Sequence, residues 1–163
     1  MSARLAKQAG TALKAHGMTL VTAESCTGGG IAQAVTRISG SSTWFDRGFV
    51  TYSNESKEEM LGVSPETLAQ HGAVSEATVR EMAEGALQYS RAQMAVAVSG
   101  IAGPTGGTKE KPVGMVWFAW ATGDGVRTAC HHLDGDRDAI RVKSVRIALQ
   151  GVINALNSIV KIA

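Results

Sequence analysis

The stretch "AQMAVAVSGIAGPTGG", residues 92–107, decides the fold class. Its first half is small or β-branched and apolar almost throughout, which predicts a strand that is buried on both faces. Four glycines follow within residues 99–107, and they permit backbone turns and the close approach of a ligand. A buried strand that ends in such a loop is typical of open α/β sheets, which bind ligands at their strand ends.

Elements of the same kind lie on both sides of this stretch. Before it, the sequence pattern predicts helices at residues 2–16, 29–38, 55–61, 65–72 and 76–90, and strands at 18–24 and 44–53. After it, the pattern predicts a hairpin from residues 113–122 and 126–133, and a long helix over 136–160. Helices interleaved with buried strands predict a single-domain, three-layer α/β/α sandwich over residues 1–163. The hairpin makes its sheet mixed, although most strands are expected to be parallel.

The composition fits one globular domain and excludes several classes of protein. Apolar residues make up 44% of the 163 residues and charged residues 18%, which is an ordinary globular balance. The formal net charge is only +2 and basic residues alternate with acidic ones, so nucleic acid is not an expected partner. Apolar runs are interrupted well short of the roughly 18 residues of a membrane span, so no membrane is expected either. The two cysteines are far apart and no leader is predicted, so we expect a cytoplasmic protein without disulfides.

A second glycine-rich loop, "AESCTGGG" at residues 23–30, follows the predicted strand 18–24. Small hydroxyl residues lead into a glycine cluster and then into a helix, whose free N–H groups would favour an anionic group. Neither this loop nor the one at 99–107 matches a named phosphate-binding motif. Tight turns with helix caps therefore remain an equal alternative to a ligand site for each loop on its own.

A third stretch, "GSSTWFDRGFVTYSNESK" at residues 40–57, places serines, a tyrosine and a lysine around a predicted strand. A serine needs a base to become a nucleophile at neutral pH, and a lysine shielded from water can be that base. A tyrosine near a lysine can relay or donate a proton. The spacing alone is not diagnostic, and a strand with polar ends beside a solvated lysine is the simpler interpretation.

The histidines do not predict a metal site. His131 and His132 follow Cys130 directly, and neighbouring residues on a strand point to opposite faces of the sheet. The remaining histidines, His16 and His71, lie near helix ends, so the pattern carries little weight as a ligand set.

Six motifs in order resemble the CinA C-terminal domain family: "TAESCTGG", "GSSTWFDRGFVTYSNESK", "GAVS", "SGIAGPTGG", "KPVGMVWFA" and "GDRDAIR". The resemblance covers nearly the whole chain, from about Leu5 to Leu156. It implies a compact α/β/α domain that uses neither a metal nor an organic cofactor. It also implies hydrolysis of the carboxamide of nicotinamide mononucleotide (NMN), which gives nicotinic acid mononucleotide and ammonia, and self-association of the chain.

The resemblance also implies roles for individual residues. The family's nucleophile falls on Ser42, and Tyr52 and Lys57 become its activating partners. If Lys57 supplies only a positive charge, Ser25 is the first alternative nucleophile. The arginine after the "GDR" turn falls on Arg141, which could pair with the 5′-phosphate of the substrate. The remaining substrate-binding positions are the small hydroxyl residues and glycines of the two loops: Ser25, Gly28, Gly29, Ser99, Gly100 and Gly103.

Other features limit or extend these expectations. Gly30 and Thr105 depart from the residues usual at these positions in the family, where a larger residue and an acid are common, and both border the expected pocket. The apolar terminal helix, Trp117, Trp120 and the "SIVKIA" tail suggest an exposed patch, from which we expect a homodimer. A nucleotide-binding regulatory module, or a partner protein in competence or damage responses, is the alternative to an enzyme.

Overall fold

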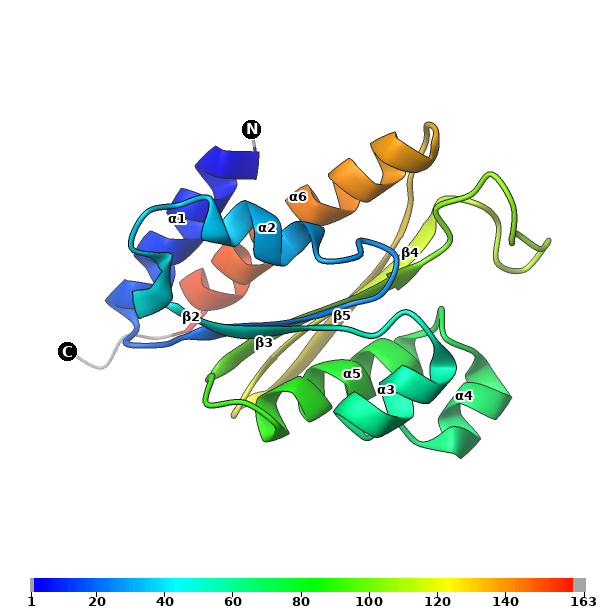
Figure 1. Cartoon of the computed structure of the whole chain (residues 1–163), viewed down its shortest axis with the longest axis horizontal. Helices are drawn as coiled ribbons and strands as arrows, with labels where there is room; N and C mark the ends of the chain where they lie inside the picture. Colours follow the sequence, from blue (N-terminus) through cyan, green and yellow to red (C-terminus); the bar gives the residue numbers. More distant parts are fainter. Residues whose placement is uncertain (1, 160–163) are drawn as a thin grey trace.

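The computed structural model describes residues 2–159, which fold into three layers with a five-stranded sheet in the middle (Figure 1). The strands are β1 (Leu20–Glu24), β2 (Phe45–Val50), β3 (Met94–Gly100), β4 (Met115–Thr122) and β5 (Gly125–His132). Their order in the sheet is β2-β1-β3-β4-β5. The β1 strand pairs in parallel with β2 and β3, whereas β4 is antiparallel to both β3 and β5. The expected mixed sheet, in which most strands share one direction, is confirmed.

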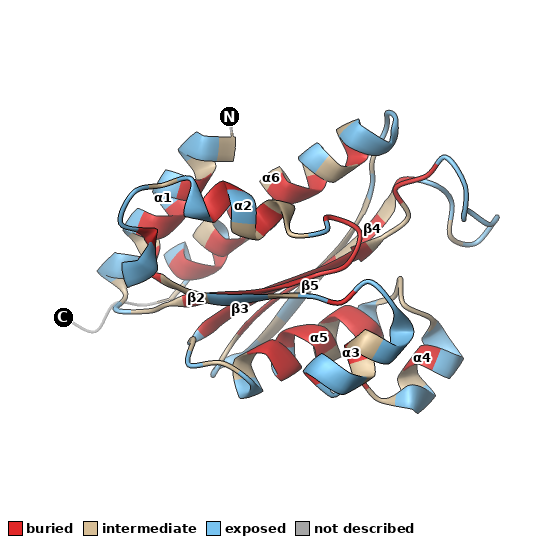
Figure 2. Ribbon diagram, in the orientation of Figure 1, coloured by how far each residue is buried: buried red, intermediate tan, exposed pale blue. Residues whose placement is uncertain are grey.

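Helices cover both faces of this sheet (Figure 1). One face carries α1 (Ser2–Ala15), α2 (Gly30–Thr36) and α6 (Arg137–Asn157), and the other carries α3 (Asn54–Leu61), α4 (Pro65–His71) and α5 (Glu76–Gln88). Each helical layer forms its own buried apolar cluster against the sheet, and the central strands contribute to both clusters. Figure 2 shows this as continuous burial along β1 and β3. The β3 strand is apolar up to Ser99, whereas β1 also buries the polar residues Thr22 and Glu24.

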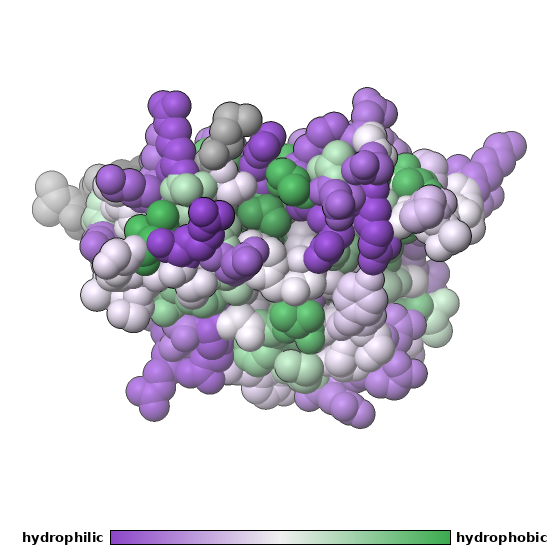
Figure 3. Space-filling view, turned by 45° about the horizontal axis from the view of Figure 1, so that its top comes forward, coloured by the Kyte–Doolittle hydropathy of each residue, from purple (hydrophilic) through white to green (hydrophobic). Residues whose placement is uncertain are grey.

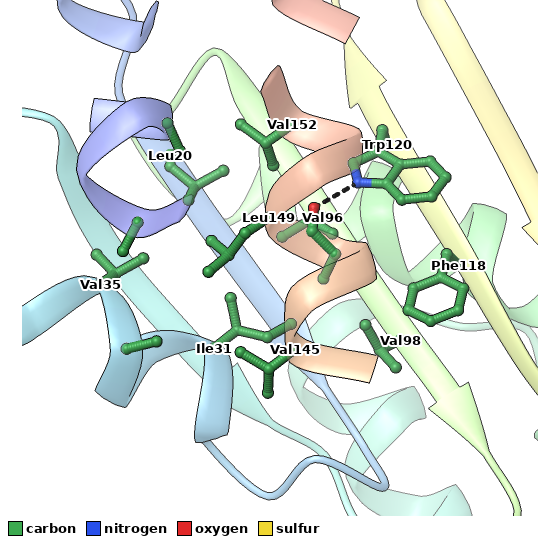
Figure 4. Packing of buried hydrophobic residues seen from close by; sticks show 14 of the residues in the cluster. Leu20, Ile31, Val35, Val96, Val98, Phe118, Trp120, Val145, Leu149 and Val152 are labelled. Atoms are coloured by element: carbon green, nitrogen blue, oxygen red, sulfur yellow. Dashed lines mark hydrogen bonds between the residues drawn. The ribbon is translucent and has the colours of Figure 1, made fainter. Parts of the chain in front are cut away.

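The long helix α6 lies very close to the sheet at Gly151. A Cβ atom at this position would lie 2.0 Å from the indole of Trp120, so only glycine permits this separation. The indole Nε1 of Trp120 donates a hydrogen bond of 2.9 Å to the carbonyl of Ala148, one turn earlier in α6 (Figure 4). Trp120 is therefore part of the core and does not belong to an exposed apolar patch.

The helix boundaries follow ordinary capping chemistry. Ser75 precedes α5 and its hydroxyl accepts the N–H of Thr78, and Asp136 precedes α6 and accepts the N–H of Ala139. The expected end of the last helix at residue 160 lies outside the described residues. Between residues 2 and 159, no helix is long and apolar enough to cross a membrane.

Candidate active site

The carboxyl ends of β1 and β3 lie side by side, and each leads into one of the two glycine-rich loops. Glu24 of β1 is in register with Val98 of β3, and the N–H of Ser25 donates to the Val98 carbonyl at 3.0 Å. Ser25 therefore leaves β1 beside the end of β3, where Ser99 is still part of the strand. The register of β1 and β3 thus brings the two glycine-rich loops together at one edge of the sheet, where open α/β sheets bind ligands.

A buried lysine reaches Ser25 from the opposite layer. Lys57 Nζ donates hydrogen bonds to Ser25 Oγ at 3.0 Å and to the Thr51 carbonyl at 2.8 Å. Both side chains are buried, with 9% of Ser25 and 1% of Lys57 exposed. A hydroxyl within hydrogen-bond distance of a buried amine is the arrangement that a serine nucleophile and its base require.

The start of α3 explains how a lysine comes to be buried here. Ser53 caps this helix in a reciprocal capping box with Ser56, which fixes the first turn directly after β2. Lys57 lies in that turn, and Leu61 lies one turn later on the same buried face of the helix. The side chain of Lys57 therefore points toward the sheet rather than into solvent.

Burial sets the protonation behaviour of the neighbouring groups. It lowers the pKa of Lys57 below the ordinary value of 10.5, because a charged amine loses its hydration. Burial also raises the pKa of Cys26 to about 11, so this thiol stays protonated at neutral pH. Of the two candidate nucleophiles next to Lys57, the serine is thus the one with a base at hydrogen-bond distance.

A cavity of about 250 Å³ opens in front of this pair. Its wall includes Ser25, Cys26, Tyr52, Gly100, Gly103 and Arg137. The left-handed conformation of Gly103 (φ 78°) turns the second loop around the cavity, and a Cβ atom here would lie 2.4 Å from Val113. Ser99 itself is buried at the end of β3, and Gly28 and Gly29 form the turn into α2 rather than the cavity wall.

One basic residue in the cavity wall was not identified from the sequence. Arg137, the first residue of α6, donates to the Gly103 carbonyl at 2.8 Å and to the Tyr52 hydroxyl at 2.9 Å. Its guanidinium thus joins the glycine loop to the segment between β2 and α3. The motif "GDRDAIR" contains both Arg137 and Arg141, and its position in a helix start could have pointed to either arginine.

Arg141 lies one turn further along α6 and faces elsewhere. Its Nε donates to the Cys26 carbonyl at 3.1 Å, and its Nη2 donates to the Thr27 carbonyl at 3.3 Å. It lines a separate groove between α2 and α6 and not the cavity in front of Ser25. Arg141 therefore supports the first loop from behind.

The expected pairing of Ser42 with Lys57 needs correction. Ser42 lies in a 3-10 turn (Ser41–Thr43) before β2, whereas Lys57 follows the other end of this strand. Six extended residues separate the two ends by about 20 Å. In Figure 1 the turn lies at the left end of β2 and α3 beyond the right end. Sequence proximity to Lys57 was misleading because a strand intervenes.

Tyr52 also has a different environment from the expected one. It is 62% exposed at the rim of the cavity, and its hydroxyl accepts the hydrogen bond from Arg137. No hydrogen bond joins Tyr52 to Lys57 within the described chain. The structure thus brings together Ser25, Lys57, Arg137 and Tyr52, and leaves Ser42 and Arg141 outside the cavity.

No cluster of metal-binding side chains accompanies this site. Among residues 2–159, no group of three or more His, Cys, Asp or Glu side chains is arranged to hold a metal ion.

Known proteins are similar to this chain in both sequence and fold. The model of the CinA C-terminal domain matches residues 2–156. The chain belongs to this family. It is 61% identical over 150 residues to nicotinamide-nucleotide amidohydrolase PncC of Escherichia coli K12, covering 90% of each chain. It is 50% identical over 149 residues to the protein of the same name from Pseudomonas putida, covering 91% of this chain and 93% of the other.

A solved structure from the CinA family has the same fold. The CinA superfamily protein of Klebsiella pneumoniae 700603 superposes with a TM-score of 0.93 at 41% sequence identity. The match covers 96% of this chain and 98% of that protein. The predicted α/β class and the resemblance to the CinA C-terminal domain are both confirmed.

Proposed function

We propose that this protein is a nicotinamide-nucleotide amidohydrolase that converts NMN to nicotinic acid mononucleotide and ammonia. The observation that carries the proposal is the buried Ser25–Lys57 pair, with 3.0 Å between Oγ and Nζ, whose serine lies in the wall of a cavity. The relatives that are 50–61% identical over about nine-tenths of the chain are named for the same reaction.

The pair supplies the nucleophile and the base for amide hydrolysis. Ser25 Oγ bonds to the carboxamide carbon while Lys57 Nζ takes the hydroxyl proton. The C–N bond then breaks, and the departing nitrogen takes this proton and leaves as ammonia. Water attacks the resulting ester, and its proton returns through Lys57 to Ser25 Oγ as the acid product leaves. Lys57 must be neutral at the start, which its lowered pKa favours.

The backbone after Ser25 can stabilise the oxyanion that forms during attack. In the part of the chain that the structure describes, the N–H groups of Cys26 and Thr27 donate to no backbone carbonyl, so they are available to a substrate oxygen. They belong to the first and second residues after the nucleophile, where an oxyanion hole can draw its backbone donors. The Gly28 N–H is already used, because it donates to the Ser25 carbonyl at 3.0 Å.

The nucleotide phosphate is assigned to Arg137 rather than to Arg141. Arg137 shares the cavity wall with Ser25, and a guanidinium binds phosphate through charge-assisted hydrogen bonds. Arg137→Gln should raise the KM for NMN by about 10- to 100-fold, which corresponds to the loss of one hydrogen bond to a charged group. The KM for the riboside, which lacks the phosphate, should change little. Equal changes for the two substrates would contradict the assignment.

The experiment that tests the function is ammonia release from purified protein. NMN should be hydrolysed, and free nicotinamide should be a far poorer substrate because it lacks the group that Arg137 binds. Activity should persist in EDTA, since Ser25 and Lys57 are proposed to supply both nucleophile and base. Failure to release ammonia from NMN, or loss of activity in EDTA with recovery on adding zinc, would reject the proposal.

A cytoplasmic homodimer remains part of the proposal, although its structural basis changes. Trp120 is buried, and the tail at 160–163 lies outside the described residues. On the face that Figure 3 shows, the apolar residues form small, separate groups rather than one patch. The β5 strand offers another basis, because it forms an edge of the sheet and contains neither lysine nor proline. Light scattering at micromolar concentration should give twice the chain mass, and a monomer would contradict this.

A further inference from the structure

A fully buried carboxylate lies directly before Ser25 in the sequence. Glu24 is the last residue of β1 and is 0% exposed. No basic side chain lies within 4.0 Å of it among residues 2–159. A buried charge of this kind is strongly unfavourable unless hydrogen bonds satisfy it. Its hydrogen-bond partners therefore indicate what the fold uses it for.

Both oxygens of Glu24 accept hydrogen bonds from the segment that follows Ser25. Oε1 accepts from the Thr27 hydroxyl at 2.6 Å and from the Ile31 N–H at 2.9 Å. Oε2 accepts from the Ala32 N–H at 3.1 Å. One side chain thus joins the end of β1 to the loop after Ser25 and to the first turn of α2.

Glu24 replaces the missing cap of α2. Gly29 precedes this helix in a left-handed conformation (φ 99°) and has no side chain to cap it. Ile31 and Ala32 are the second and third residues of the helix, whose N–H groups an N-cap side chain would normally bind. Because the cap comes from the strand and not from the loop, it fixes both ends of the segment that carries Ser25.

The same residue is connected to the base. The backbone carbonyl of Glu24 accepts the N–H of Thr51 at 2.8 Å, and the Thr51 carbonyl in turn accepts from Lys57 Nζ. Arg141 holds the outer side of the loop through the Cys26 and Thr27 carbonyls. The position of Ser25 relative to Lys57 therefore depends on contacts that include Glu24.

We infer that Glu24 is a positioning residue that fixes Ser25 Oγ against Lys57 Nζ by capping α2 from the neighbouring strand. The inference rests on the proposed role of Ser25 as the nucleophile. Small displacements of a reacting group reduce the rate without changing how the rest of the substrate is bound. The effect of losing the carboxylate should therefore be on kcat, and the KM should remain close to the wild-type value.

The test substitutes Glu24→Gln. The amide keeps one oxygen for Thr27 and Ile31 but presents an NH₂ group to the Ala32 N–H, where a donor meets a donor. We expect kcat for NMN to fall by about 100-fold. Hydrogen–deuterium exchange of a peptide covering residues 25–32 should become faster.

A matched control separates positioning from a loss of stability. Glu81 on α5 also accepts at the start of a helix, from the Ser64 N–H at 2.8 Å and from the Thr67 hydroxyl at 2.5 Å. Glu81 is half-buried, whereas Glu24 is fully buried. Glu81→Gln therefore removes a helix-start carboxylate at α4, away from Ser25, and should leave both kcat and the exchange of residues 25–32 unchanged.

The outcomes are distinct from those of the function test. Unchanged exchange at 25–32 in Glu24→Gln would overturn the inference, whatever the activity of the protein. Faster exchange with a wild-type kcat would also overturn it. If Glu81→Gln lost as much kcat as Glu24→Gln, Glu24 would be shown to contribute only to the stability of the fold. If the wild-type protein does not hydrolyse NMN, the proposed function fails, and with it the role of Glu24 in placing a nucleophile.

Discussion

Ser25→Ala should lower kcat for NMN by several orders of magnitude, whereas Ser42→Ala should leave it close to the wild-type value. The first substitution removes the only hydroxyl that the structure places at hydrogen-bond distance from Lys57 Nζ within residues 2–159. Removing a covalent nucleophile alone eliminates most of the acceleration that nucleophile and base provide together. Ser42 is exposed and lies before the opposite end of β2.

The measurement is steady-state ammonia release, with circular dichroism to show that both variants are folded. A second variant, Ser25→Ala combined with Lys57→Arg, should be little slower than Ser25→Ala, because residues that act as one unit give non-additive losses. The opposite result, an inactive Ser42→Ala and an active Ser25→Ala, would return the nucleophile to the position implied by family resemblance. Multiplicative losses in the double variant would mean that Lys57 acts independently of Ser25.

The layers of the fold were predictable because they depend on local patterns. The small apolar run at 94–100 is buried on both faces, as its composition predicts. Ser75 and Asp136 precede helices because their side chains accept N–H groups, which is a signal that a single sequence contains. Each glycine-rich loop was predicted to follow a buried strand, and both do, at the ends of β1 and β3.

The contact between Ser25 and Lys57 was not predictable in the same way. Lys57 is five residues from Tyr52 in the sequence, but it contacts Ser25, 32 residues away. That contact depends on which strand lies beside β2 and in which register, and neither follows from the composition of residues 40–57. The assignment of the phosphate contact to Arg137 or Arg141 likewise depends on their positions one turn apart in α6. Arg137 lines the cavity in front of Ser25, and Arg141 lines the separate groove between α2 and α6.

Glu24 shows a different limit. In the sequence it ends a predicted strand, where a polar residue is ordinarily exposed to solvent. Its burial and its role as a cap are visible only once α2 is placed over β1, since the N–H groups that it accepts belong to residues 31 and 32. A buried carboxylate in a strand is unusual, and the hydrogen bonds that it accepts in the folded chain explain it better than its place at a strand end does.

Lys57→Arg should reduce kcat to about the level of Ser25→Ala. Arginine keeps the positive charge but cannot be deprotonated in a protein, so it cannot take the hydroxyl proton. Lys14→Arg on the exposed surface of α1 is the matched control and should retain full activity. A Lys57→Arg protein with near-normal turnover would mean that this position supplies only charge, and that the base lies elsewhere.

The pH dependence of stability tests the same property without any substrate. Burial lowers the pKa of Lys57 in the folded protein, whereas the unfolded chain keeps a value near 10.5. Between these two values the unfolded chain binds more protons, so the free energy of unfolding contributed by this residue increases as the pH rises. The melting temperature of the wild type relative to Lys57→Met should therefore rise toward pH 10.5 and level off below the folded-state pKa. A difference that stays constant over this range would show that Lys57 remains charged in the fold, and a permanently charged lysine cannot activate Ser25 at neutral pH.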